Sequence, residues 1–74
     1  MIKKGDILTL SDNNEYTVVD ILNANEKTYV YLVDINNVIN FIYGKLENDE
    51  ITEIEDSNEL EFVINLINEN MHNA

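Results

Sequence analysis

The side chains best able to do chemistry in this 74-residue chain are carboxylates, and they are concentrated in one segment. Between Glu47 and Glu61 the sequence has no base and eight acids: Glu47, Asp49, Glu50, Glu53, Glu55, Asp56, Glu59 and Glu61. A surface of this kind repels nucleic acid and anionic membranes, and it attracts basic partners over long distances. The segment therefore predicts an acidic face that binds a basic protein surface, with no direct contact to nucleic acid or membrane.

Carboxylates can also catalyse reactions or bind metals. Acid–base pairs such as those of glycosidases need a pocket, and a chain this short has little core from which to build one. An EF-hand loop that began at Asp12 would need a ligand at its fifth position and glycine at its sixth, where the sequence has Tyr16 and Thr17. The segment 47–56 contains no glycine turn either. We expect no enzyme activity, no metal site and no cofactor.

Other reactive side chains are few. The only histidine, His72, is near the C-terminal end, and the two serines, Ser11 and Ser57, occur in turn or capping contexts without a base nearby. The absence of cysteine excludes thiol chemistry, and two glycines are too few for a phosphate-binding loop. All four basic residues are lysines, so bidentate recognition of phosphate by arginine is absent too.

The acids have a plainer interpretation, in which a structural or housekeeping barrel uses its net charge of −11 only to remain soluble. Either interpretation is compatible with a homodimer formed through an exposed strand edge.

Because 15 acids face only four lysines, we expect mutual repulsion to raise carboxylate pKa values on balance. The melting temperature would then be higher near about pH 5 than at about pH 8, and salt would raise it.

The elements that must position these residues follow from periodicity and turn formers. Alternating or β-branched segments predict five strands, at residues 7–10, 15–22, 27–35, 38–43 and 50–55. Segment 27–35 has apolar side chains pointing both ways, which favours a central strand covered on both faces. We expect Gly44 to end or bulge the fourth strand. Most of the four tyrosines should be buried or half-buried, with one or two able to anchor a protein contact.

The last segment changes to a helical period. Asp56 is a good N-cap, and Glu59 three residues later would complete a capping box. A stripe at helical spacing follows, formed by Leu60, Val63, Ile64, Ile67 and Met71. The pattern predicts a helix over 57–70, capped at residue 56, and a frayed tail at 71–74.

Together these elements predict one α+β domain, β-rich over 1–55, with about five short antiparallel strands and a C-terminal helix. The strands should form a strongly bent sheet or SH3-like barrel, with the helix at one open end or across one face. A plain antiparallel meander is the alternative. No segment has the length of a signal-peptide core or a membrane span, so we expect a cytoplasmic protein.

Three motifs carry a resemblance to a known group: KGDI at 4–7, EYTVVD at 15–20 and YVYLV at 29–33. The chain resembles small acidic SH3-like or β-barrel proteins of low-G+C Gram-positive bacteria, their phages and mobile elements. In these, the same motifs precede an acidic stretch and a C-terminal helix. The resemblance carries no catalytic residue. Because such proteins include DNA mimics and anti-CRISPR inhibitors, it implies an inhibitor of a basic nucleic-acid-handling protein.

Overall fold

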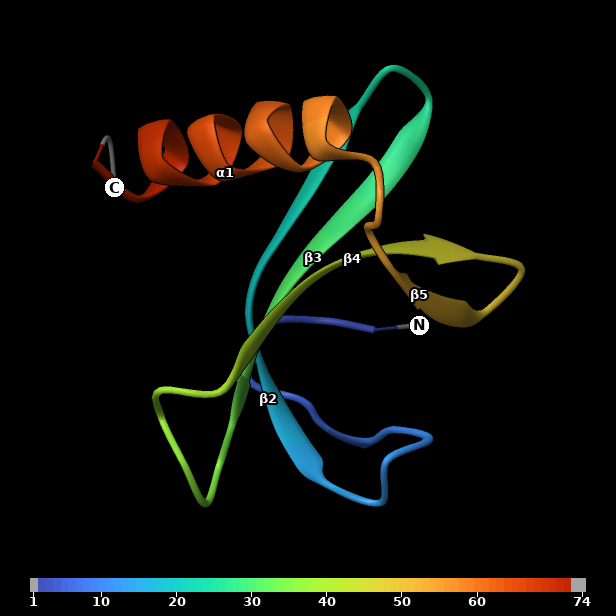
Figure 1. The fold of residues 1–74 in the computed structure, drawn as a ribbon, viewed down its shortest axis with the longest axis vertical. Helices are drawn as coiled ribbons and strands as arrows, with labels where there is room; N and C mark the ends of the chain where they lie inside the picture. Colours follow the sequence, from blue (N-terminus) through green and yellow to red (C-terminus); the bar gives the residue numbers. More distant parts are fainter. Residues whose placement is uncertain (1, 73–74) are drawn as a thin grey trace.

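A computed structural model of the chain describes residues 2–72, which form one antiparallel sheet followed by a helix (Figure 1). The elements are β1 (Ile7–Thr9), β2 (Glu15–Ala24), β3 (Lys27–Asp34), β4 (Phe41–Glu47), β5 (Glu50–Glu53) and α1 (Ser57–His72). Each strand pairs with its neighbours in sequence, so β1 and β5 are the two edges of a strongly curled half-barrel. The predicted α+β class and bent five-stranded sheet are confirmed.

Strand β3 contributes to hydrophobic cores on both faces of the sheet. On the concave face, Val30 and Leu32 are fully buried with Tyr16 and Val18 of β2. On the convex face, Tyr29 packs with Ile54 and with two residues of α1, Val63 and Ile67. Burial of one such side chain contributes roughly 1.5–3 kcal/mol. The prediction that this strand is covered on both faces is confirmed, and α1 supplies one of the covers.

A β-bulge in β2 decides which face Asp20 occupies. The register pairs Val18 with Leu32 and Asp20 with Tyr31, so Val19 is the extra residue. Strict alternation would place Asp20 on the same concave, apolar face as Val18. The bulge moves Asp20 to the convex face, where α1 lies.

The fourth strand differs from its prediction. It begins at Phe41 instead of residue 38, and Val38 and Ile39 lie in an exposed turn, 76% and 80% accessible. The turn is held by hydrogen bonds, because the Asp34 carboxylate accepts from the Asn36 N–H (2.8 Å) and from the Asn40 amide (3.2 Å). These polar bonds outweigh the β-propensity of two apolar residues.

Gly44 does not end β4, because the strand continues through it to Glu47. The glycine pairs with Val30 on one side and with Glu53 on the other. A Cβ atom at this position would lie 3.0 Å from Ile51 Cγ2 and 3.2 Å from the Thr52 carbonyl oxygen. Gly44 therefore permits the close approach of β4 and β5 in the curled sheet.

The helix begins as predicted, with Asp56 accepting a hydrogen bond from the Asn58 N–H (3.2 Å). Glu59 makes no bond back to Asp56 among those the structure records, and contacts the sheet instead. Helix α1 continues two residues beyond the predicted end, to His72, whose side chain lies outside the described residues together with residues 73–74. The other strands begin where predicted and end within two residues of the prediction.

Glu26 gives a test of the β2–β3 turn. The two turn residues, Asn25 and Glu26, both have positive φ (53° and 64°), and a glutamate in this region is strained. We expect Glu26→Gly to stabilise the protein by about 0.5–1 kcal/mol, after the greater flexibility of unfolded glycine is subtracted. Chemical denaturation measures the change. Glu26→Gln is the control, since it removes the charge and keeps the strain, and an equal gain in this variant would contradict the backbone explanation.

Candidate functional site

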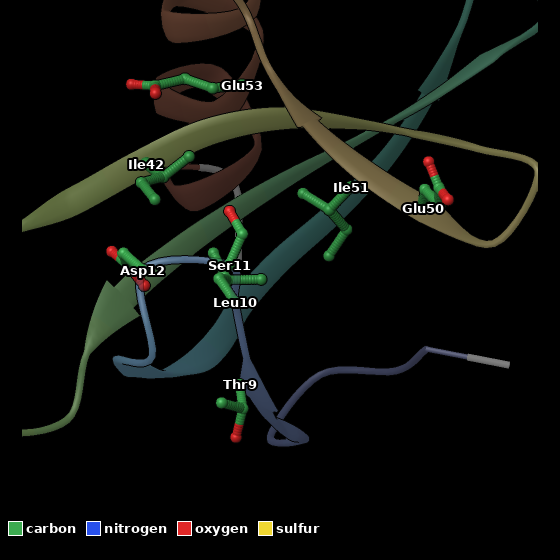
Figure 2. Close-up of a pocket in the computed structure, with 8 residues that line it drawn as sticks. All are labelled: Thr9, Leu10, Ser11, Asp12, Ile42, Glu50, Ile51 and Glu53. Carbon is green, nitrogen blue, oxygen red and sulfur yellow. The ribbon is translucent and has the colours of Figure 1, made fainter.

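An open groove of about 570 Å³ lies between the two edges of the sheet (Figure 2). One wall comes from β1 and the turn after it, the other from β5, and Ile42 of β4 lies between them. The lining residues are Thr9, Leu10, Ser11, Asp12, Ile42, Glu50, Ile51 and Glu53. The groove therefore occupies the gap that a closed barrel would fill with sheet pairing.

The groove has an apolar floor and an acidic rim. Leu10, Ile42 and Ile51 are partly buried and pack against the concave core. In Figure 2, Leu10 and Ile51 lie between Asp12 and Glu50, and Ile42 lies between Asp12 and Glu53. Such a site can hold an apolar group and at the same time place positive charges beside carboxylates.

Asp12 is the rim residue that sequence reasoning missed, because only the fold brings it near β5. Its carboxylate accepts hydrogen bonds from the Asn14 N–H (2.9 Å) and the Tyr16 hydroxyl (2.8 Å). The bond from the Asn14 backbone, followed by that from Tyr16, lowers the pKa of Asp12. The same contact raises the pKa of the Tyr16 hydroxyl. Asp12 is thus a fixed negative charge at neutral pH.

The predicted acidic residues divide between several elements. Glu47, Asp49 and Glu50 lie on the β4–β5 hairpin, whose turn residues Asn48 and Asp49 both have positive φ. Glu53 ends β5, Glu55 and Asp56 follow it, and Glu61 is on the exposed side of α1. Within residues 2–72, five of the eight make no ion pair and serve as no cap: Asp49, Glu50, Glu53, Glu55 and Glu61. Of the predicted set, the groove brings together Glu50 and Glu53.

Glu59 is placed apart from the groove, where it joins the helix to the sheet. Its carboxylate accepts hydrogen bonds from the Tyr29 hydroxyl (2.9 Å) and Lys45 Nζ (3.1 Å), and Lys27 Nζ lies 3.5 Å away. The bond from Lys45, followed by that from Tyr29, lowers the pKa of Glu59. The bond to Glu59 also raises the pKa of Lys45.

A second carboxylate holds the other end of the helix. Asp20, buried at 2% exposure, accepts a hydrogen bond from the Asn70 amide (2.8 Å) and pairs with Lys4 Nζ (3.2 Å). Burial acts to raise the pKa of Asp20, but the bonds from Asn70, Lys4 and the Ile21 N–H outweigh it and lower the pKa. Our expectation that repulsion raises carboxylate pKa values is therefore wrong for these two residues and for Asp12.

An apolar surface lies at the β3–β4 turn, where Val38, Ile39 and the half-exposed Phe41 are accessible. Phe41 meets two half-buried tyrosines edge-on, and these two, Tyr31 and Tyr43, stack at 4.9 Å. The other two tyrosines are buried, in agreement with the prediction. This surface is a second place where a protein could make contact.

Within residues 2–72, no three histidine, aspartate or glutamate side chains are grouped so that they could hold a metal ion. In the same range, no helix has the length and apolar character needed to cross a membrane.

Comparison with other proteins adds no assignment. No protein-family model, curated protein or solved structure matches this chain. The geometry of the groove therefore carries the functional argument.

The two helix-anchoring carboxylates predict how stability depends on pH. Because the folded pKa values of Asp20 and Glu59 are lowered, the unfolded chain binds more protons than the folded protein below about pH 4. Their stabilisation is present above that pH and is lost as the pH falls through the folded values. We expect the melting temperature, followed by circular dichroism, to drop steeply below about pH 4.

Single variants test the assignment to these two groups. Asp20→Asn and Glu59→Gln should each lower the melting temperature at neutral pH and flatten its fall in acid. Glu61→Gln is the matched control, because it removes the same charge from an exposed position of α1 that has no lysine partner. A control that is as destabilised as Glu59→Gln, or acid slopes that coincide with the wild type, would contradict the anchoring role.

Proposed function

We propose that the protein is a non-enzymatic interaction module that binds a basic partner through the groove between β1 and β5. The observation that carries this proposal is the combination of an apolar floor with three rim carboxylates, Asp12, Glu50 and Glu53. The floor supplies contact area, and the rim selects positive charge.

The distribution of lysines supports the same proposal. Lys4 pairs with Asp20, while Lys27 and Lys45 both pair with Glu59. Three of the four lysines are therefore engaged in holding the helix. The rim carboxylates have no lysine partner within residues 2–72, so they present negative charge that a basic ligand could neutralise.

The more specific form of the proposal rests on the sequence resemblance to phage and mobile-element proteins. In that form, the acidic face imitates a nucleic-acid backbone and inhibits a basic nucleic-acid-handling protein, as DNA mimics and anti-CRISPR proteins do. A pull-down at low ionic strength tests this form, and recovery of no basic nucleic-acid-handling protein would contradict it.

The binding proposal is tested with a lysine-rich peptide and matched charge variants. Because the attraction is electrostatic, we expect affinity to fall at least tenfold between about 20 mM and 500 mM salt. Glu50→Gln with Glu53→Gln should weaken binding by about fivefold or more at low salt, since two rim charges are lost. Isothermal titration calorimetry measures both effects.

The control is the double variant Glu26→Gln with Glu69→Gln, which has the same net charge but changes exposed residues outside the groove. It should bind nearly as well as the wild type. If both double variants weaken binding equally, the attraction comes from total charge and not from the groove. That result would favour the interpretation in which acidity serves solubility.

A further inference from the structure

We propose that the basic partner enters the groove as an extended segment that pairs with the edge of β5 and adds a strand to the half-barrel. This inference rests on the proposed function and specifies the form of its ligand. It follows from the direction of backbone groups on β5, from the side chains beside them and from the charge at this edge.

The backbone N–H and C=O groups of successive β5 residues point alternately toward β4 and toward the open edge of the sheet. The hairpin has a two-residue turn, with Glu47 paired to Glu50, and the Ile54 N–H donates to the Tyr43 carbonyl (3.1 Å). In an antiparallel ladder, every second residue therefore bonds to β4, and the residues between direct their N–H and C=O groups outward. Ile51 and Glu53 are those residues. Their unpaired groups face the groove and can bond an incoming strand.

The side chains of the same two residues define the sequence that fits. Ile51 packs with the concave core, and Glu53, two positions along, is exposed on the same face. In an antiparallel partner, the residue opposite Ile51 faces the apolar floor, and the residue opposite Glu53 faces a carboxylate. The structure thus favours a partner with a lysine or arginine at position i and an apolar residue at position i+2, both directed into the groove.

Charge argues against a second copy of this chain as the occupant. Antiparallel pairing of two β5 edges would bring Glu50 and Glu53 of one molecule close to the same residues of the other. Like charges across a strand pair are destabilising, and charged residues on an edge are a common protection against self-association. A basic segment would instead place positive charges beside Glu50 and Glu53, so that the same contacts become attractive.

The test uses three versions of the end-blocked peptide Thr-Lys-Thr-Val-Thr-Lys-Thr. In antiparallel pairing with β5, the side chains of the valine and the two lysines enter the groove. The N–H groups of these same residues point toward β5. N-methylation of one lysine and the valine removes two of these hydrogen bonds while charge and side chains remain. N-methylation of two threonines is the matched control, because their N–H groups point away from β5.

We expect the control peptide to bind within about twofold of the unmodified one, and the peptide methylated at lysine and valine to bind on the order of tenfold more weakly. In nuclear magnetic resonance spectra, the amide signals of Ile51 and Glu53 should shift on binding. Equal affinity of all three peptides would overturn strand pairing and leave the proposed function standing. If none binds while the lysine-rich peptide does, this inference alone fails, and if neither binds, both fail.

Protein variants supply an independent measurement. Glu53→Pro removes the outward N–H at the edge, whereas Glu53→Gln removes only the charge. Proline is tolerated on edge strands where the N–H faces solvent, and a melting curve checks that the fold is retained. The proline variant should bind the unmodified peptide several-fold more weakly than the glutamine variant. Equal affinity, or a dimer in light scattering that already covers β5, would overturn the inference.

Discussion

A carboxylate anchors each end of helix α1 on the convex face of the sheet. Glu59 in the first turn contacts Tyr29, Lys45 and Lys27, and Asn70 in the last turn contacts Asp20, which also pairs with Lys4. Between these anchors, Val63 and Ile67 cover Tyr29 and Ile54. The polar contacts fix where the helix lies along the strands, while apolar burial supplies most of the stabilisation.

This arrangement determines the charge of the remaining surface. A chain with only four lysines has little positive charge to distribute, and the helix anchors engage three of them. The opposite part of the sheet is left with carboxylates around an open groove. The helix side and the groove side thus differ in electrostatic character: the anchoring acids Asp20 and Glu59 are paired with lysines, whereas the rim acids have no lysine partner within residues 2–72 and are available to a ligand.

Periodicity and capping residues predicted the structural features that depend on local sequence. The central position of β3 and the N-cap at Asp56 are examples, because each follows from a few adjacent side chains. The groove could not be predicted, because only the curvature of the sheet brings Asp12 near Glu53. That curvature cannot be read from the sequence. Asp20 was missed for a related reason, because a bulge of one residue reverses the face that alternation assigns to it. The sequence around Glu59 fits a capping box as well as it fits a contact with the sheet. Its lysine partners become evident only once the helix is docked on the sheet.

The order of the strands bears on how quickly the molecule can assemble. Each strand pairs with its sequence neighbour, and two of the hairpins close through two-residue turns, so most of the sheet forms from contacts between nearby residues. The contact between Asp20 and Asn70, 50 positions apart, belongs to helix docking and is the costlier step in chain entropy. Without proline, no slow isomerisation interrupts the process. Such a topology suits refolding in one kinetic phase, on a timescale of roughly milliseconds.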